Sequence, residues 1–415
     1  MKFAIMGLGG RGQTYAHFVK YYGSDVVAVC DPDLTRKEIA KSLYGMPEEG
    51  FYTDEDEFFA KGKIADALVI ATLDNIHYRQ AIKAIEIGYD ILLEKPIAMT
   101  LEECEAIRDK AIECGVKVVV CHVLRYSPYY NKVKEVLDSG VIGDVVCVEL
   151  TENIGYYHYA HSYCRGNWRN TDVSTPLILA KNCHDTDMIC WLIGKKCLAV
   201  NSFGSLKHFK AENAPEGSTE YCFSCPHKDT CKYNCFYLYS NEEYEKIAGL
   251  AKHGRLGDSE AEINKSLSDP ENLLARCVYH CDNNVADNQI VNMLFEDDII
   301  AQLKSIAFTN DLRRILTIHG SEGMVYFSPE GKREVIFEKL NGEKIAYPIE
   351  EPKGGYAHHG GGDVGIVSQF IEYLETGKMT KNITDITASV MGHKVAFLAE
   401  KSRLNGGRTY YLDEE

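Results

Sequence analysis

Short apolar runs alternate with stretches of helical spacing over the first 122 residues of the chain. In the helical stretches, which include residues 76–87 and 101–114, apolar side chains recur at roughly every third or fourth position. An alternation of buried strands with amphipathic helices is typical of βαβ units, so it predicts a parallel sheet of the Rossmann type. The strands are expected at residues 1–6, 25–30, 64–71, 91–93 and 116–121.

A glycine-rich turn follows the first strand. Gly7, Gly9 and Gly12 form a G-x-G-x-x-G pattern ahead of a helix expected near residues 14–21. In such a turn the first glycine permits the bend, the second lets a pyrophosphate approach the backbone, and the third lets the helix pack on the strand. Asp31 ends the second strand, where a carboxylate accepts the ribose hydroxyls of an adenosine and repels a 2′-phosphate. The combination predicts NAD as the cofactor.

Three further loops follow strands of the predicted sheet, at residues 71–77, 94–96 and 122–126. Ligands of open parallel sheets bind beyond the carboxyl ends of the strands, so these loops are expected to line the cofactor pocket with the glycine turn. The residues predicted to bind the cofactor are Gly7, Gly9, Gly10, Arg11, Gly12, Asp31, Thr72, Leu73, Asp74, His77, Glu94, Lys95, His122 and Arg125.

A second unit is expected from residue 123 to 415. Apolar runs at residues 145–151, 289–295, 299–308 and 315–320 predict strands, and several of them are rich in β-branched side chains. The last helix is expected at residues 385–404, with Thr384 as its N-cap.

Residues 156–170 are dense in aromatic, His, Arg and Asn side chains. Sugars and polyols need this mixture, because aromatic faces cover C–H groups and polar groups bind hydroxyls. The alternative is a polar loop with a few aromatic residues in the core. The candidate substrate residues, taken with two outside this stretch, are Tyr126, His161, Arg165, Asn167, Trp168, Arg169 and His358.

The glycine turn, the Ala71-Thr72-x4-His77 loop and the Glu94-Lys95-Pro96 triplet resemble the Gfo/Idh/MocA oxidoreductases, the glucose–fructose oxidoreductase and inositol dehydrogenase family. The resemblance implies a Rossmann domain (1–122), then an α+β domain (123–415) with a large, mostly antiparallel open sheet. One face of that sheet would cover the nicotinamide, and the other would serve a homodimer or homotetramer. The final helix would pack back on the Rossmann domain.

The resemblance also implies the catalytic residues. The lysine beside the nicotinamide corresponds to Lys95, and the family's catalytic histidine corresponds to His184 by its spacing to the W-L-x-G that ends its helix. Many members place an aspartate four residues before that histidine, whereas this chain has Ala180 there and Lys181 next. Neighbouring cations lower each other's pKa, so we expect Lys95 and His184 to take the hydroxyl proton with Lys181 assisting. The alternative for Lys95 is a surface ion pair with Glu94.

A cysteine-rich insertion at about residues 206–282 lies outside the resemblance. Its four closely spaced thiols predict a structural zinc site, with an iron–sulfur cluster or four unliganded cysteines as the alternatives. The predicted ligands are Cys222, Cys225, Cys231 and Cys235, and a second group, Cys277, His280 and Cys281, is an alternative source of ligands. A catalytic metal held by His358 or His359 with His161 or His184 is a further alternative.

Composition narrows the class of protein. Of the 415 residues, 45% are hydrophobic and 26% are charged, which is ordinary for a globular protein. The net charge of −16 argues against a nucleic-acid surface and an anionic membrane surface, which attract basic patches. The early first strand leaves no room for a signal peptide, and fifteen cysteines fit a reducing compartment, so a cytoplasmic location is expected.

The sequence therefore predicts an NAD-dependent oxidoreductase that moves hydride between the nicotinamide and a secondary alcohol of a sugar, glycoside or polyol. One alternative is a redox-neutral glycoside hydrolase that keeps NAD bound and proceeds through a transient keto-sugar. Another is a non-catalytic NAD-binding regulatory protein, which an ion-paired Lys95 pointing away from the pocket would favour.

Overall fold

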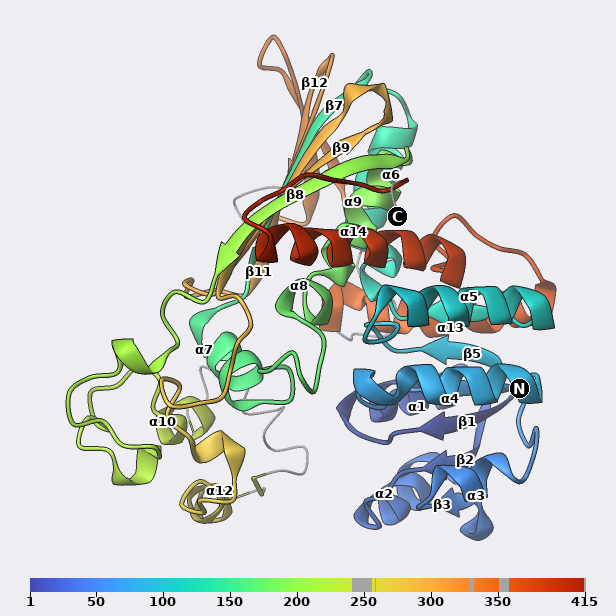
Figure 1. Ribbon diagram of the computed structural model, residues 1–415. Coiled ribbons are helices and arrows are strands. Elements are labelled where there is room, and N and C mark those ends of the chain that lie inside the picture. The colour runs from blue at the N-terminus through green and yellow to red at the C-terminus, as the bar shows by residue number, and fades with distance from the viewer. Residues whose placement is uncertain (241–255, 258, 328–331, 351–357, 414–415) are drawn as a thin grey trace.

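A computed structural model describes residues 1–240, 256–257, 259–327, 332–350 and 358–413. It contains two β-sheets joined through a layer of helices, with the C-terminal helix α14 (Ile386–Leu404) between them (Figure 1). The described part of the chain has no helix that is both long and apolar enough to cross a membrane.

The first sheet is entirely parallel and has six strands in the order β3-β2-β1-β4-β5-β6. This confirms the predicted Rossmann-type sheet. The strands are β1 (Lys2–Met6), β2 (Asp25–Cys30), β3 (Phe51–Tyr52), β4 (Ala67–Ile70), β5 (Asp90–Leu93) and β6 (Val118–Val120). The helices between them are α1 (Gly10–Tyr21), α2 (Thr35–Tyr44), α3 (Glu55–Phe59), α4 (Asp74–Ile87) and α5 (Leu101–Cys114).

Both faces of this sheet are buried, which explains the continuous apolar runs. Phe3 and Ile5 of β1 belong to one core and Ala4 and Met6 to another, because successive strand residues point to opposite faces. The first core also contains residues of α1 and of α13 (Gly362–Thr376), and the second contains residues of α4, α5 and α14. Two late helices of the chain thus complete the packing around the first sheet.

The second sheet has nine strands in the order β14-β13-β12-β11-β7-β10-β9-β8-β15, and all pairs except the parallel β7 and β10 are antiparallel. The predicted large, mostly antiparallel sheet is therefore confirmed. Its strands are β7 (Val145–Asn153), β8 (Cys197–Ser205), β9 (Asn288–Phe295), β10 (Ile300–Ile306), β11 (Arg313–Gly320), β12 (Gly323–Phe327), β13 (Glu334–Lys339), β14 (Lys344–Pro348) and β15 (Tyr410–Tyr411).

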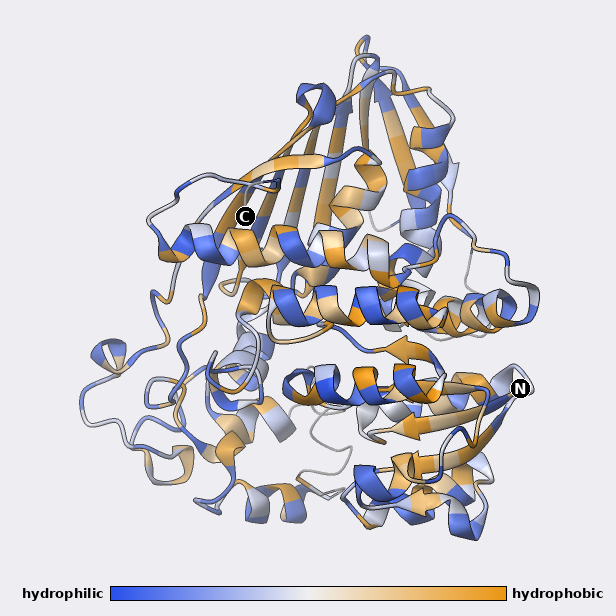
Figure 2. Ribbon diagram, turned by 45° about the vertical axis from the view of Figure 1, so that its right-hand side comes forward, coloured by the Kyte–Doolittle hydropathy of each residue, from blue (hydrophilic) through white to orange (hydrophobic). Residues whose placement is uncertain are grey.

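One face of the second sheet packs on helices and the other is open. The core on the packed face includes residues of α6 (Pro128–Asp138), α9 (Cys183–Ile193) and α14. Blue and orange alternate along its strands in Figure 2, as expected for strands with one buried face. Each of five neighbouring strands exposes a large apolar side chain. These side chains are Val146, Phe203, Ile290, Ile300 and Ile315.

The cysteine-rich insertion shares a hydrophobic core with residues 154–180. Short helices α7 (Tyr156–Tyr159), α8 (Leu177–Ala180), α10 (Cys235–Ser240) and α12 (Glu260–Ser266) lie in or beside it. Buried aromatic and apolar side chains pack together here, including Tyr159, Phe209, Tyr233, Leu238 and Leu267. The insertion is therefore held by packing against residues 154–180 as well as by its own apolar side chains.

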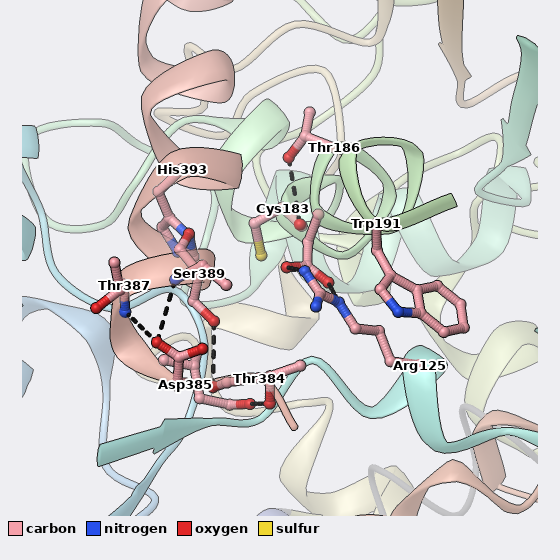
Figure 3. Close-up of polar contacts among 12 residues, drawn as sticks. Arg125, Cys183, Thr186, Trp191, Thr384, Asp385, Thr387, Ser389 and His393 are labelled. Carbon is pink, nitrogen blue, oxygen red and sulfur yellow. Dashed lines mark hydrogen bonds and ion pairs between the residues drawn. The ribbon is translucent and has the colours of Figure 1, made fainter. Parts of the chain in front are cut away.

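Element boundaries differ most at the helix starts. Helix α1 begins at Gly10 rather than near residue 14. The N-cap of α14 is Asp385, whose carboxylate accepts hydrogen bonds from the amides of Thr387 and Ala388 (Figure 3). Thr384, the predicted N-cap, instead donates its hydroxyl hydrogen to the carbonyl of Val120 on β6, at 2.5 Å.

Candidate active site

The glycine turn has the backbone that the sequence pattern requires. Gly7 has φ +84°, and a Cβ built on Gly12 would lie 1.9 Å from the Gly7 carbonyl oxygen, so neither position tolerates a side chain. No atom lies within 4 Å of a Cβ built on Gly9 or Gly10, at the N-terminus of α1. The space over this helix end fits a pyrophosphate, which free N–H groups would bind. Asp31 Oδ2 accepts the Leu8 amide at 2.7 Å, which ties the turn to the end of β2.

Arg11, in the same turn, is held by two buried carboxylates. Its Nε donates to Glu94 Oε1 at 2.6 Å, and its Nη2 donates to Asp363 Oδ1 at 2.7 Å. The Tyr15 hydroxyl donates to the same Glu94 oxygen at 2.5 Å. These polar groups of Arg11 and Glu94 therefore serve a network inside the protein, although both residues were predicted to contact the cofactor.

Two more of the predicted cofactor residues hold the pocket loops together. The ring nitrogens of His77 lie 2.8 Å from the Pro96 carbonyl and 3.2 Å from the Thr72 carbonyl. Asp74 Oδ2 accepts the Thr175 amide at 3.0 Å and the Thr175 hydroxyl at 2.7 Å. Leu73, immediately before Asp74, remains 42% exposed and so can contact a ligand.

Lys95 follows β5 at the carboxyl edge of the first sheet, ahead of a cis peptide bond to Pro96. Its Nζ donates to the carbonyl oxygen of Ala180 at 2.8 Å, on the helix that precedes α9. The Glu94 carboxylate receives Arg11, Tyr15 and the Lys95 backbone amide instead of the ammonium. The alternative of a Lys95–Glu94 ion pair is therefore not what the structure contains.

His184 lies near Lys95, in the first turn of α9, and is buried. The centre of its ring is 5.6 Å from that of His122 and 6.0 Å from that of His359. Among the described residues, His184 Nδ1 and both nitrogens of His122 have no hydrogen-bond partner. Burial lowers the pKa of His184 well below its usual value, and Lys95, His122 and His359 lower it further. Neutral imidazoles with unused polar atoms are available here for a ligand.

Lys181 belongs to a buried charge network under these histidines. Its Nζ lies 3.1 Å from Glu152 Oε1, while Arg314 Nε lies 3.2 Å from Glu152 Oε2 and 2.5 Å from Asp185 Oδ1. Burial raises the pKa of Glu152 and lowers the pKa of Lys181, because it penalises both charged forms. Burial therefore favours the neutral amine of Lys181, while the Glu152 carboxylate favours its ammonium form.

Two further histidines lie in this region, His359 and His158. His359 Nδ1 lies 2.9 Å from Asp363 Oδ2. His158 is partly buried, and its pKa is lowered by burial and then by Lys181, His161 and Lys95. From the sequence, His358 was predicted as a substrate residue and His359 only as an alternative metal ligand. The side chain of His358 lies outside what the structure describes, as do residues 356–357 of the same loop. The i, i+4 spacing of His359 and Asp363 at the start of α13 was the available signal.

Several predicted contact residues are occupied elsewhere. The Arg125 guanidinium forms a buried bidentate pair with Asp187, at 2.6 and 2.7 Å, and lies beside Trp191 (Figure 3). The Tyr126 hydroxyl is buried and hydrogen bonded to Thr384. Arg169 pairs with Asp282 at 2.8 Å, and Trp168 packs against the core of the insertion. Each of these side chains thus has partners inside the protein, and its contact with a ligand stays a prediction.

Two other substrate predictions, His161 and Arg165, also point into the protein. His161 Nδ1 lies 2.7 Å from the Tyr239 hydroxyl. Arg165 is fully buried and donates to the carbonyl oxygens of Arg276 and Tyr233, both at 2.6 Å. Arg165 therefore has no exposed atom with which to bind a substrate.

The cysteine-rich insertion does not form the predicted metal site. Among the described residues, no group of three or more His, Cys, Asp or Glu side chains is arranged to hold a metal ion, so zinc at Cys222, Cys225, Cys231 and Cys235 is unsupported. The same finding leaves the proposed histidine metal site without support. Arg165 Nη2 lies 3.6 Å from Cys222 Sγ instead. A hydrogen bond with Cys235 and the charge of Arg165 lower the pKa of Cys222 to about 5 against the effect of burial.

The fold and these residues define an NAD-binding oxidoreductase architecture, and the chain belongs to the corresponding family. Residues 1–122 match the oxidoreductase family with an NAD-binding Rossmann fold, and residues 134–414 match the family's C-terminal alpha/beta domain. The resemblance to the Gfo/Idh/MocA oxidoreductases is therefore confirmed.

Two relatives and one solved structure illustrate what the chain is similar to. The chain is similar to the oxidoreductase YteT of Bacillus subtilis, with 24% identity over 82% of this chain and 80% of the relative. It is 28% identical to scyllo-inositol 2-dehydrogenase (NAD(+)) of B. subtilis, over 50% of this chain and 58% of that protein. The fold is shared by scyllo-inositol dehydrogenase from Lactobacillus casei, solved with NAD(H) and scyllo-inositol, at TM-score 0.67, 17% identity and coverage of 100% and 99%.

Proposed function

We propose that this protein is an NAD-dependent dehydrogenase of a secondary alcohol in a polyol or sugar. The observation that carries the proposal is the placement of Lys95, which ends a strand of the dinucleotide-binding sheet and hydrogen bonds to Ala180 of the helix preceding His184. Family membership and the dehydrogenase names of several relatives support the same activity.

In this proposal the first domain, residues 1–122, binds the dinucleotide. The N-terminus of α1 would bind the pyrophosphate over Gly9 and Gly10, and Asp31 would bind the adenosine ribose. The second domain, residues 123–415, would bind the substrate. When bound, NAD supplies the hydride acceptor, while the protein supplies position and proton transfer.

The proton of the reacting hydroxyl needs an acceptor beside Lys95. The ammonium of Lys95 would hold the hydroxyl oxygen and stabilise it as negative charge develops. His184 would contact the same oxygen from α9. Lys181, whose Nζ lies 3.1 Å from Glu152 Oε1, would assist by adding a positive charge near the site. Asn167 lies in the segment beside His161 and remains a candidate for binding the other hydroxyls.

A second candidate function is redox-neutral cleavage of a glycoside. Elimination from a keto-sugar needs more proton-transfer groups than a simple oxidation does, and this site holds His122, His158, His184 and His359 around Lys95 and Lys181. The family's usual aspartate is also replaced by Ala180. A relative named 2,7-anhydro-N-acetylneuraminate hydratase, 28% identical over 46% of this chain, shares the family.

The test offers the purified protein NAD together with scyllo-inositol, myo-inositol, free sugars or aryl glycosides, and follows NADH and released aglycone in parallel. NADH formed with an inositol or sugar, and lost in Lys95→Met, supports the dehydrogenase. Aglycone released without NADH supports the second function. Lys117→Met is the matched control, because Lys117 also donates to a backbone carbonyl, that of Tyr373, but on α13. Absence of both products would overturn both proposals.

We also propose that the protein forms a homo-oligomer through the open face of the second sheet. The exposed apolar side chains of Val146, Phe203, Ile290, Ile300 and Ile315 support this, because patches of this kind mark interaction surfaces. Sedimentation of the wild-type protein and of Phe203→Glu would test it. A wild-type monomer would contradict it.

A further inference from the structure

We propose that His359, held by Asp363, is the base that accepts the substrate's hydroxyl proton, and that Asp363 is its positioning residue. The inference rests on the dehydrogenase proposed above and assigns its proton acceptor. It differs from the family pattern, in which the catalytic helix itself carries the histidine and its aspartate.

The hydrogen bond between the two residues fixes the tautomer of His359. Nδ1 lies 2.9 Å from Asp363 Oδ2, and a carboxylate only accepts hydrogen bonds, so Nδ1 carries the hydrogen of the neutral ring. Nε2 then keeps a lone pair that can take a proton. The other oxygen of Asp363 accepts from Arg11 Nη2 at 2.7 Å, so the carboxylate is held at both ends.

The backbone from His359 to Gly362 is held by contacts with residues 123–127. His359 has φ +49°, in the left-handed region, and Gly360 and Gly361 follow with φ +60° and +86°. The Ser127 hydroxyl donates to the Gly360 carbonyl at 3.0 Å, and a Cβ built on Gly362 would lie 2.2 Å from the Val123 carbonyl oxygen. This backbone conformation is uncommon for a residue other than glycine, and such conformations cluster at functional sites.

His359 lies at the edge of the Lys95 site. The centre of its ring is 6.0 Å from that of His184, so the two imidazoles border the same space. The side chain of His359 keeps 37% of its surface exposed, whereas His184 is 6% exposed. His359 is therefore much more accessible to water than His184, which favours release of a proton from His359.

The charges around the two rings favour His359 as the base. His184 faces Lys95, Arg314 and the rings of His122 and His359, and burial and all of these neighbours disfavour its protonated form. The pKa of His359 is also lowered, by burial first and then by Arg11 from α1 and Arg314 from β11, but Asp363 raises it, whereas no carboxylate does so for His184. The carboxylate is ionised, since Arg11 and His359 outweigh the effect of burial and lower its pKa.

In the proposed oxidation the hydroxyl O–H bond would break as its proton passes to His359 Nε2. The hydride of the same carbon would leave for bound NAD⁺, which supplies the two-electron acceptor, so that the alcohol would become a ketone. The imidazolium then releases its proton to water. Lys95 remains an ammonium throughout and binds the developing alkoxide.

Two variants test the assignment by kinetics. In His359→Gln we expect kcat to fall by about 10²- to 10⁴-fold and the acid limb of the pH–rate profile to disappear, while the Kd for NAD stays unchanged. In Asp363→Asn the imidazolium loses its partner, so the acid limb should move to lower pH. His319→Gln is the matched control, because His319 also lies beside a carboxylate, that of Glu149 at 3.9 Å, but on β11 of the second sheet. An unchanged profile in an active His359→Gln would overturn the inference while leaving the dehydrogenase intact.

A second measurement needs no turnover. Nitrogen-15 spectra of histidine-labelled protein, assigned with His359→Gln, should show the Nδ1–H tautomer for His359 and its loss in Asp363→Asn. Observation of the Nε2–H tautomer in the wild-type protein would overturn the inference. If the wild-type protein oxidises no polyol or sugar, the proposed function fails, and the tautomer spectra still decide whether Asp363 holds the ring.

Discussion

His393 Nε2 accepts a hydrogen bond from the backbone amide of Ile97 at 3.0 Å, although 296 positions separate the two residues. The other nitrogen, Nδ1, therefore carries the ring hydrogen and donates it to the Ser389 carbonyl at 3.0 Å on the same helix, α14 (Figure 3). Ile97 is two residues after Lys95, so the last long helix fixes the loop that carries the proposed catalytic lysine. His393 serves as a neutral ring, fully buried, and this makes folding sensitive to acid.

The pH dependence of stability should show the contribution of His393. Burial lowers its pKa to about 3, whereas in the unfolded chain it is near the usual value of about 6.5. Between these values the unfolded state binds the extra proton, so the free energy of unfolding falls as pH falls. The loss from one such group is about 1.4 kcal/mol per pH unit inside this window.

Urea unfolding from about pH 6.5 down to about pH 4 would measure this loss. His393→Gln should be less stable than the wild-type protein near neutral pH. As pH falls, its free energy of unfolding should decrease less steeply, because the variant lacks the one proton that His393 binds on unfolding. Other buried histidines contribute the same slope to both proteins and cancel in the comparison. Equal slopes would contradict the assignment of a buried neutral ring.

The pairing of Arg11 with Glu94 and Asp363 should stabilise the fold. Removing the guanidinium in Arg11→Met leaves two buried carboxylates with fewer partners, so we expect a loss of about 3 kcal/mol. Thermal or urea unfolding would measure it. Lys20→Met is the control, because Lys20 makes an exposed ion pair with Asp25 at 2.9 Å and should cost about 0–1 kcal/mol. A smaller loss for Arg11→Met than for Lys20→Met would contradict the network.

The sequence predicted those features of the fold that depend on residues close together in the chain. The strands of the first sheet are buried on both faces and so appear as apolar runs, and the backbone of Gly7 and Gly12 follows from a spacing of a few residues. The ion pairs of Arg11 could not be predicted from the sequence, because its partners are 83 and 352 positions away. No local signal reports a partner at that separation.

The aromatic, histidine-rich stretch shows a second limit. Its composition suits a sugar site and a core equally well, and Arg165 proved to be buried against thiols and carbonyl groups. The choice between His358 and His359 has the same origin, because a glycine-rich loop has no periodicity that says which side chain faces inward. Only the position of Asp363 in the following helix distinguishes them.

The thiol of Cys222 should titrate at unusually low pH. Its hydrogen bond with Cys235 and the Arg165 guanidinium lower its pKa to about 5 although burial opposes this. The ultraviolet absorbance of thiolate, followed against pH, should therefore include a step near this value that Cys222→Ser removes. In Arg165→Met the step should move to higher pH, since the thiolate loses its cation.

Metal analysis of the same protein checks the competing explanation for a thiolate. The described residues hold no metal-binding group, so we expect less than one equivalent of zinc and an unchanged titration step after chelation. A full equivalent of zinc that stabilises the fold would contradict the thiolate–guanidinium pair as the resting state of Cys222.

The glycine turn gives the sharpest comparison of two neighbouring positions. In Gly12→Ala the new Cβ would lie 1.9 Å from the Gly7 carbonyl oxygen, so α1 must move away from β1. We expect a loss of several kcal/mol, in the range of severe backbone clashes, and weaker NAD binding because the helix N-terminus shifts. In Gly10→Ala the Cβ meets no atom within 4 Å and the residue is helical, so stability should be unchanged or higher by about 0.4–1 kcal/mol. Thermal unfolding with and without NAD separates the two effects, because a variant that keeps its fold but loses the NAD-dependent rise in Tm has lost binding alone. Equal stability of the two variants would mean that the third glycine does not set the distance between helix and strand.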